Sequence, residues 1–112
     1  MIERHSGGIV MSNCRITVVK RTINQDLIDE HVHDSRKNLG RCSAFEDGQE
    51  FVIEGFPQKP DGFCDWAWAT IHKDVVAVMF GGDYPWLKQP GTAITCCTDG
   101  LRPVIFSVER TE

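Results

Sequence analysis

The segment Phe63–Phe80 is the longest stretch of this 112-residue sequence that has the apolar spacing of an α-helix. At roughly 100° per residue, its apolar side chains form one stripe, which consists of Ala67, Ile71, Val75, Val78 and Met79. Gly81 and Gly82 follow, where a left-handed C-cap ends a helix. Because an amphipathic helix must bury such a stripe, the rest of the chain has to provide the layer that covers it.

Trp66 projects from the side of this helix that lies opposite the apolar stripe. A large aromatic side chain in that position needs a cover, from a loop or from another subunit. The segment Asp83–Pro90, which we call the aromatic loop, adds Tyr84 and Trp86 close to the helix end. We therefore expect a homo-oligomer through the Trp66 face or the aromatic loop, with core packing or the wall of an apolar pocket as alternatives.

Four runs rich in β-branched and aromatic residues are predicted to be strands, namely Arg15–Arg21, Gly48–Glu54, Thr92–Cys97 and Arg102–Glu109. In the last run the alternation of Val104, Phe106 and Val108 predicts one buried face. A short helix is expected over Gln25–Val32, with Asn24 as its N-cap.

The turn between the last two strands is predicted at Thr98–Leu101, because an Asp-Gly pair supplies the positive φ that a tight hairpin turn needs. Successive side chains of a strand point to opposite faces, so Cys96 and Cys97 are separated. We expect Cys96 to share a buried face with Ile94, and Cys97 to be the more accessible thiol.

These elements predict the α+β class, with a small antiparallel sheet or barrel of about four strands and one long helix packed on it. The order of the elements lacks the alternation of strands and helices that builds a parallel sheet. Residues 13–112 are predicted to form a single α+β domain, and residues 1–12 a disordered N-terminal extension. The sequence does not decide whether Met1 or Met11 is the true first residue.

Charge and hydropathy exclude several kinds of partner. Twelve Lys and Arg residues against 16 Asp and Glu give a net charge of -4, which argues against binding to nucleic acid or to an anionic membrane surface. No apolar run approaches the roughly 18 residues that cross a membrane. The cysteines number five, an odd count, and no secretory signal is apparent. We therefore expect a reducing cytoplasm, and thiols or metal ligands rather than disulfides.

The familiar catalytic motifs, phosphate loops and C-x-x-C pairs do not occur in the sequence, so the remaining chemistry lies in three cysteines. Cys64 opens the long helix, where the positive end of the helix dipole favours a thiolate, although a plain buried thiol is the simpler alternative. Cys97 lies just before the predicted hairpin turn, and Cys42 a few residues before the second strand. We expect the three thiols to meet at one end of the sheet.

Four further side chains complete the candidate site. Asp65 and Asp99 each lie within two residues of one of these thiols, with local capping and turn formation as the alternative role. Arg102 follows the hairpin turn and is suited to bind a carboxylate, its own or that of a ligand. Trp68 lies near the centre of the apolar stripe.

Two stretches of the chain resemble motifs of a known family. The segments Gly62–Trp68 (GFCDWAW) and Cys97–Phe106 (CTDGLRPVIF) are similar to the G-F-C-x-W-A-W and C-P-D-G-x-R-P-V-x-F motifs of a family of small uncharacterised prokaryotic proteins. This chain departs from that pattern at Asp65 and Thr98, where the family tends to have proline. The resemblance implies no activity, and it singles out the same three cysteines.

Three hypotheses for function follow from these observations. The first is a small non-catalytic binding or oligomeric module. The second is a metal or thiol site formed by Cys42, Cys64 and Cys97, in which three thiolates and one further ligand would suit zinc or iron. The third is a thiol-dependent enzyme with Cys64 or Cys97 as nucleophile and Arg102 as the group that binds an anionic substrate.

Overall fold

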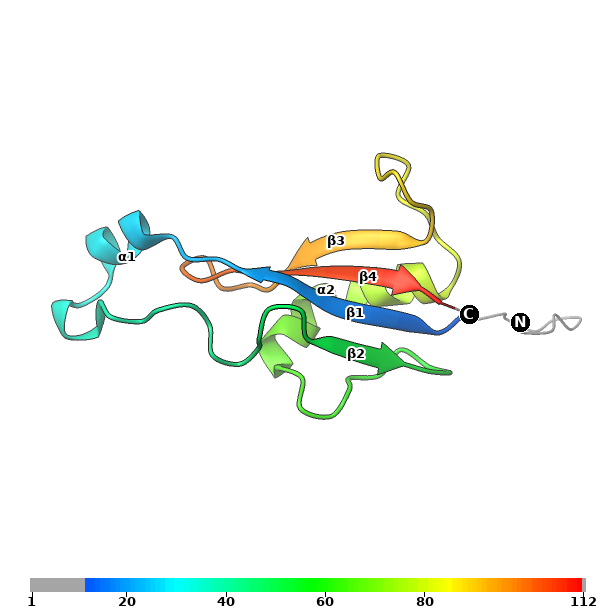
Figure 1. The fold of residues 1–112 in the computed structure, drawn as a ribbon, viewed down its shortest axis with the longest axis horizontal. Coiled ribbons are helices and arrows are strands. Elements are labelled where there is room, and N and C mark those ends of the chain that lie inside the picture. The colour runs from blue at the N-terminus through cyan, green and yellow to red at the C-terminus, as the bar shows by residue number, and fades with distance from the viewer. Residues whose placement is uncertain (1–11, 112) are drawn as a thin grey trace, which may run out of the picture.

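The computed structural model describes residues 12–111 and consists of one antiparallel sheet with two helices (Figure 1). The strands are β1 (Cys14–Arg21), β2 (Glu50–Ile53), β3 (Thr92–Cys96) and β4 (Val104–Arg110). Their spatial order is β2-β1-β4-β3, and every neighbouring pair is antiparallel. The helices are α1 (Gln25–His31) and α2 (Asp65–Met79), and only α2 packs on the sheet. The predicted α+β class is confirmed, and the sheet is open rather than a barrel.

The core lies between α2 and one face of the sheet. In the central strands β1 and β4, alternate side chains over residues 14–18 and 104–108 are fully buried, and this set consists of Cys14, Ile16, Val18, Val104, Phe106 and Val108. Facing them is the predicted helical stripe, all of it fully buried, which consists of Ala67, Ile71, Val75, Val78 and Met79. Both periodicities are therefore confirmed, and burying each of the larger side chains contributes about 1.5–3 kcal/mol.

Four phenylalanines join the loops at one end of the sheet to this core. Phe45 precedes β2 and contacts Phe51, Phe63 and Phe106 edge-to-face, with ring centroids 5.0–6.0 Å apart. Phe63 directly precedes the N-cap of α2 and also packs against Phe51, at 4.9 Å. Such aromatic pairs each contribute about 0.5–1.5 kcal/mol beyond their buried area. The segment before β2 and the start of α2 are therefore fixed relative to β4.

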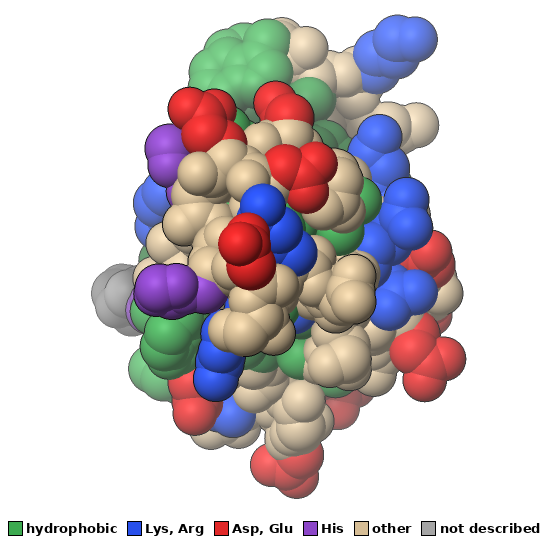
Figure 2. Space-filling view, turned by 90° about the vertical axis from the view of Figure 1, so that its left-hand side faces the viewer, with side chains coloured by type: hydrophobic (Ala, Val, Ile, Leu, Met, Phe, Trp, Pro, Cys, Tyr) green, Lys and Arg blue, Asp and Glu red, His purple; other side chains and the backbone are tan. Residues whose placement is uncertain are grey.

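The helix α1 lies beyond the end of the sheet, where β1 and the connection between β3 and β4 project (Figure 1). Its N-cap residue Asn24 is held there by two hydrogen bonds, from its backbone N to Leu101 O (2.8 Å) and from Nδ2 to Gly100 O (2.7 Å). Figure 2 shows that acidic, basic and histidine side chains intermingle on this end. His31 and His33 are both exposed.

The predicted facing of β3 is wrong. Ile94 is 58% exposed and Cys96 is exposed, whereas Ala93 is buried and Cys97 packs against the core. The reason lies in the pairing with β4, because residues directly opposite in an antiparallel pair point to the same side of the sheet. Ala93 lies opposite Val108, which is fully buried, so Ala93 faces the core. The alternate residues Ile94 and Cys96 therefore face outward.

The predicted mechanism of the turn between β3 and β4 is also wrong. Gly100 does not adopt a positive φ, and the connection spans residues 97–103 rather than a tight four-residue turn. Asp99 organises it instead, because its Oδ1 accepts hydrogen bonds from the backbone N of Leu101 (2.9 Å) and Arg102 (3.2 Å). An aspartate side chain in this role replaces the backbone conformation that glycine supplies in a tight turn.

The first and last described residues and the end of α2 lie together at the other end of the sheet. Ser12 N donates to Met79 O (2.8 Å), and Gly81, with φ 94°, provides the left-handed residue expected after α2. Arg110 Nη1 donates to Val78 O (2.9 Å) and Gly82 O (3.1 Å), so this guanidinium binds carbonyls at the end of α2. Of the predicted extension, residues 1–11 lie outside the described part of the chain. Within residues 12–111 no helix is long and apolar enough to cross a membrane.

Candidate functional site

A cavity of about 250 Å³ lies at the end of the sheet that carries the connection between β3 and β4. Three segments far apart in the sequence surround it: residues 42–45, the first turn of α2, and residues 97–104. Five of the seven candidate residues line this cavity, namely Cys42, Cys64, Cys97, Asp99 and Arg102. The rest of its lining consists of Ser43, Ala44, Phe45, Trp66, Ala67, Thr98 and Val104. We call it the three-cysteine cavity.

Cys64 is the N-cap residue of α2. Gly62 turns the chain into the helix with a φ of 79°, and Phe63 inserts into the core. The Cys64 backbone oxygen accepts the first helical hydrogen bond, from Trp68 N at 2.9 Å. The side chain is half-buried and makes no capping hydrogen bond. The thiol therefore lies at the positive end of a 15-residue helix and remains open to the cavity.

Cys42 is held at the cavity by the end of β1. Arg21 Nη1 donates to Cys42 O (3.1 Å), and Arg41 Nε donates to Arg21 O (3.1 Å). Arg21 also pairs with Asp47, with its Nε 3.2 Å from Oδ1. Together with buried Phe45, these contacts fix an otherwise irregular segment against the sheet.

Cys97 is fixed by the backbone of β4. Its own N donates to Val104 O (3.1 Å), and Val104 N donates to the Cys97 sulfur (3.3 Å). The thiol is half-buried and packs against the core. The sulfur position is therefore set by the main chain of a central strand and not by a mobile turn.

Asp99 and Arg102 form an ion pair at the wall of the cavity. Arg102 Nε lies 3.3 Å from Asp99 Oδ2, and both side chains are about 30% exposed. Partial burial raises the pKa of Asp99, but the backbone N–H groups of Leu101 and Arg102 and the guanidinium lower it, and the net direction is downward. Within residues 12–111 neither Nη1 nor Nη2 of Arg102 makes a hydrogen bond to the protein.

The structure places Asp65 and Trp68 outside this cavity. Asp65 is exposed and pairs with Lys59, whose Nζ lies 3.1 Å from Oδ1. Trp68 packs between Phe63 and His72, with ring centroids 6.0 and 5.2 Å apart respectively. Trp66, two residues earlier, is the tryptophan that lines the cavity, and its side chain is 75% exposed. The sequence pattern identified its exposure but not this position at the mouth of the cavity.

Among residues 12–111 no group of three or more His, Cys, Asp or Glu side chains is arranged to hold a metal ion. The expectation of zinc or iron at Cys42, Cys64 and Cys97 therefore gains no support from the geometry. Cys14, outside the cavity, is fully buried in the core, and this burial raises the pKa of its thiol to about 11.

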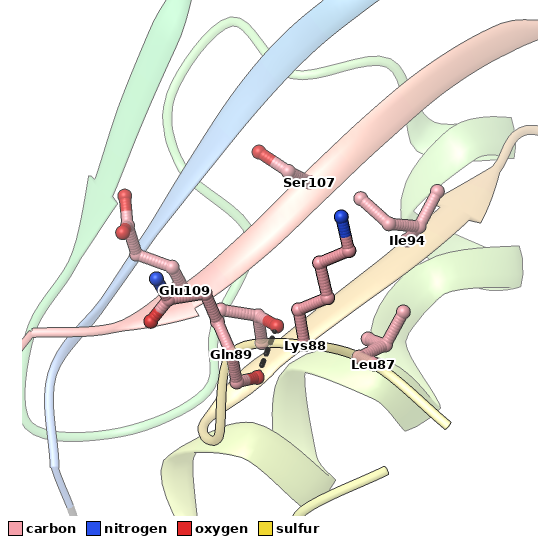
Figure 3. A pocket seen from close by; sticks show the side chains of 7 residues that line it. Leu87, Lys88, Gln89, Ile94, Ser107 and Glu109 are labelled. Carbon is pink, nitrogen blue, oxygen red and sulfur yellow. Dashed lines mark hydrogen bonds between the residues drawn. The ribbon is translucent and has the colours of Figure 1, made fainter. Parts of the chain in front are cut away.

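A second hollow lies on the outer face of the sheet, which α2 does not cover. Figure 3 shows its lining, with Ile94 and Ser107 on adjacent strands and Leu87, Lys88 and Gln89 on the loop beside them. The hydroxyl of Thr92 donates to Gln89 O at 2.7 Å and fixes this loop against β3. The hollow has a volume of about 360 Å³, and no thiol of the described residues lines it. The aromatic loop was considered as the wall of a pocket, but its aromatic residues Tyr84 and Trp86 do not line this hollow.

Comparison with known proteins adds no assignment: no family model, no curated protein and no solved structure matches this chain. The family resemblance of the two motifs stays an expectation. The candidate site therefore rests on its own geometry.

Proposed function

We propose that this protein is a small-ligand binding module without catalytic activity, and that its binding site is the three-cysteine cavity. The observation that carries the proposal is the convergence of residues 42–45, the first turn of α2 and residues 97–104 on one cavity. A concave site with an apolar wall and a few fixed polar groups is the usual form of a small-molecule site.

The size of the cavity supports a small ligand. Its volume of about 250 Å³ is below the roughly 300–1,000 Å³ of pockets that take drug-sized molecules. Phe45, Ala67 and Val104 provide a buried apolar wall, and Trp66 lies exposed beside the opening. A ligand in the cavity would bury part of the Trp66 ring, so this exposed tryptophan has a role that needs no partner chain.

The polar groups of the cavity favour binding over thiol catalysis. A thiol nucleophile is commonly activated by an adjacent base within hydrogen-bond distance, and otherwise by a lowered pKa or by a metal ion. The described residues that line the cavity include no histidine and no lysine, and Asp99 is their sole carboxylate. Its two oxygens already accept hydrogen bonds from two backbone N–H groups and from Arg102 Nε. Asp99 therefore holds the turn and Arg102 in place and is not free to take a proton from a thiol.

Self-association remains a prediction separate from ligand binding. Trp66 is 75% and Trp86 76% exposed, and either one offers an apolar contact surface to a second copy of the chain. Sedimentation velocity of the wild-type protein and of Trp86→Ser tests the aromatic loop as the contact. A wild-type monomer at high concentration contradicts the homo-oligomer.

Thiol protection tests the proposed function directly. The protein is alkylated with N-ethylmaleimide in the presence of benzyl alcohol, benzamide or benzoate, and each cysteine is quantified by peptide mass spectrometry. A probe that fills the cavity should slow the alkylation of Cys42, Cys64 and Cys97 together. Cys96 is exposed next to Cys97 and serves as the internal control, because its rate should not change. Failure of every probe to protect the three thiols contradicts the proposed function.

A further inference from the structure

We infer that the ligand of the three-cysteine cavity carries a carboxylate, which Arg102 binds. This inference rests on the proposed function and specifies the chemical class of the ligand. It is derived from the arrangement of the ion pair on the cavity wall and from the chemistry of the remaining lining residues.

The guanidinium of Arg102 is held by one edge only. Its Nε faces Asp99 Oδ2 at 3.3 Å, while Nη1 and Nη2 make no hydrogen bond to the protein within residues 12–111. A guanidinium presents its donors as a rigid planar fork, which matches the two oxygens of a carboxylate. The unused edge of Arg102 therefore offers the cavity a donor pair of that geometry.

Asp99 acts as a positioning residue for this fork. Its Oδ1 accepts hydrogen bonds from the backbone N of Leu101 and of Arg102, which fixes the carboxylate to the turn. Its Oδ2 then fixes the guanidinium, so the side chain of Arg102 is oriented before a ligand arrives. Because this ordering precedes binding, less side-chain entropy is lost when the ligand binds.

The rest of the lining selects against a highly charged ligand. Asp99 and Arg102 are the charged residues among those that line the cavity, and they carry opposite charges. The other surfaces are thiols, small side chains and the larger apolar or aromatic groups Phe45, Trp66 and Val104. A single carboxylate with a short apolar body satisfies both parts of such a cavity, whereas a dianion such as phosphate would leave charge against the apolar wall.

Isothermal titration calorimetry with benzoate and its neutral isostere benzamide tests the inference. We expect wild-type protein to bind benzoate roughly tenfold or more tighter than benzamide, as a charge-assisted pair of hydrogen bonds implies. Arg102→Gln should abolish this preference. Arg36→Gln, which removes an exposed arginine of the α1 end, is the matched control and should leave the preference unchanged. Asp99→Asn should reduce benzoate binding and leave benzamide binding as it is, an effect that loss of stability alone does not produce.

The outcomes separate this inference from the proposed function. Equal affinities for benzoate and benzamide, or an unchanged preference in Arg102→Gln, overturn the carboxylate while the binding module stands. Tighter binding of inorganic phosphate than of benzoate overturns the carboxylate in favour of a phosphate-bearing ligand. No heat of binding from benzoate also overturns the inference, and the proposed function is then decided by thiol protection with the neutral probes.

Discussion

Replacing Tyr84 by phenylalanine tests how much its hydrogen bond to Asp74 stabilises the fold. Asp74 belongs to α2 and is the charged residue that is buried within the described part of the chain. The Tyr84 hydroxyl donates a 2.7 Å hydrogen bond to Asp74 Oδ1, and Lys73 Nζ lies 2.9 Å from Oδ2. Tyr84→Phe leaves the buried carboxylate with one donor fewer. A hydrogen bond to a charged group contributes about 1.5–3 kcal/mol, and Tyr84 is half-exposed, so we expect a loss of about 1–2 kcal/mol in the free energy of unfolding.

The loss should depend on pH in a defined direction. Burial raises the pKa of Asp74, but hydrogen bonds from Tyr84, Lys73 and Thr95 lower it more, so the folded pKa is below the ordinary value. Such a carboxyl contributes stability above pH of about 4, and the contribution is lost as the pH falls through the folded pKa. Burial and the bond to Asp74 raise the pKa of Tyr84 to about 12, so its contribution is present below pH of about 10 and is lost as the pH rises through 12.

Urea unfolding of wild-type and Tyr84→Phe protein across this pH range measures the effect. The difference between the two proteins should be constant between about pH 5 and about pH 8 and should narrow at both extremes. A double-mutant cycle with Asp74→Asn isolates the contribution of the pair. Identical stabilities at neutral pH, or a difference that widens below pH of about 4, would refute the reasoning.

Two further predictions concern residues at the site and in the core. Gly62→Ala should lower the free energy of unfolding by about 1–2 kcal/mol, because the φ of 79° at this position is strained for alanine. Gly100→Ala is the control in the same denaturation experiment. It should show no such loss, because φ at Gly100 is ordinary and an added Cβ meets open space. In native protein without ligand, N-ethylmaleimide should modify exposed Cys96 quickly and fully buried Cys14 only on unfolding. Peptide mass spectrometry over time measures both rates. Equal rates for the two cysteines would contradict the burial of Cys14.

The fold was predictable where large apolar side chains set the alternation. Val104, Phe106 and Val108 determine the facing of β4, because the alternative phase would bury Ser107 and Glu109 along with Ile105. In β3 the phase that contains Ile94 is the more apolar one, so Cys96 was expected in the core and Cys97 outside it. The pairing of Ala93 with Val108 decides between the phases, and that pairing is a long-range contact that no local pattern contains.

Five residues that line the cavity were named as site candidates from the sequence, but their arrangement was less predictable. A helix start and a turn at the end of two strands were sufficient to expect Cys64 and Cys97 at one place. The roles of Asp99 and of Trp66 depend on side-chain directions that the sequence does not determine. Asp99 bonds to the turn in place of a glycine with positive φ, and Trp66 rather than Trp68 lines the cavity, because Trp68 packs beside Phe63.

Mapping the bound position of benzoate by NMR tests the central claim most directly, since it distinguishes the three-cysteine cavity from the hollow on the outer face of the sheet. Backbone amide shifts during the titration should change at Cys42, Cys64 and Cys97 together, with no comparable change at Ile94 and Ser107 on the outer face of the sheet (Figure 3). Changes confined to Ile94 and Ser107, or scattered over the surface without saturation, would contradict a ligand site in the three-cysteine cavity.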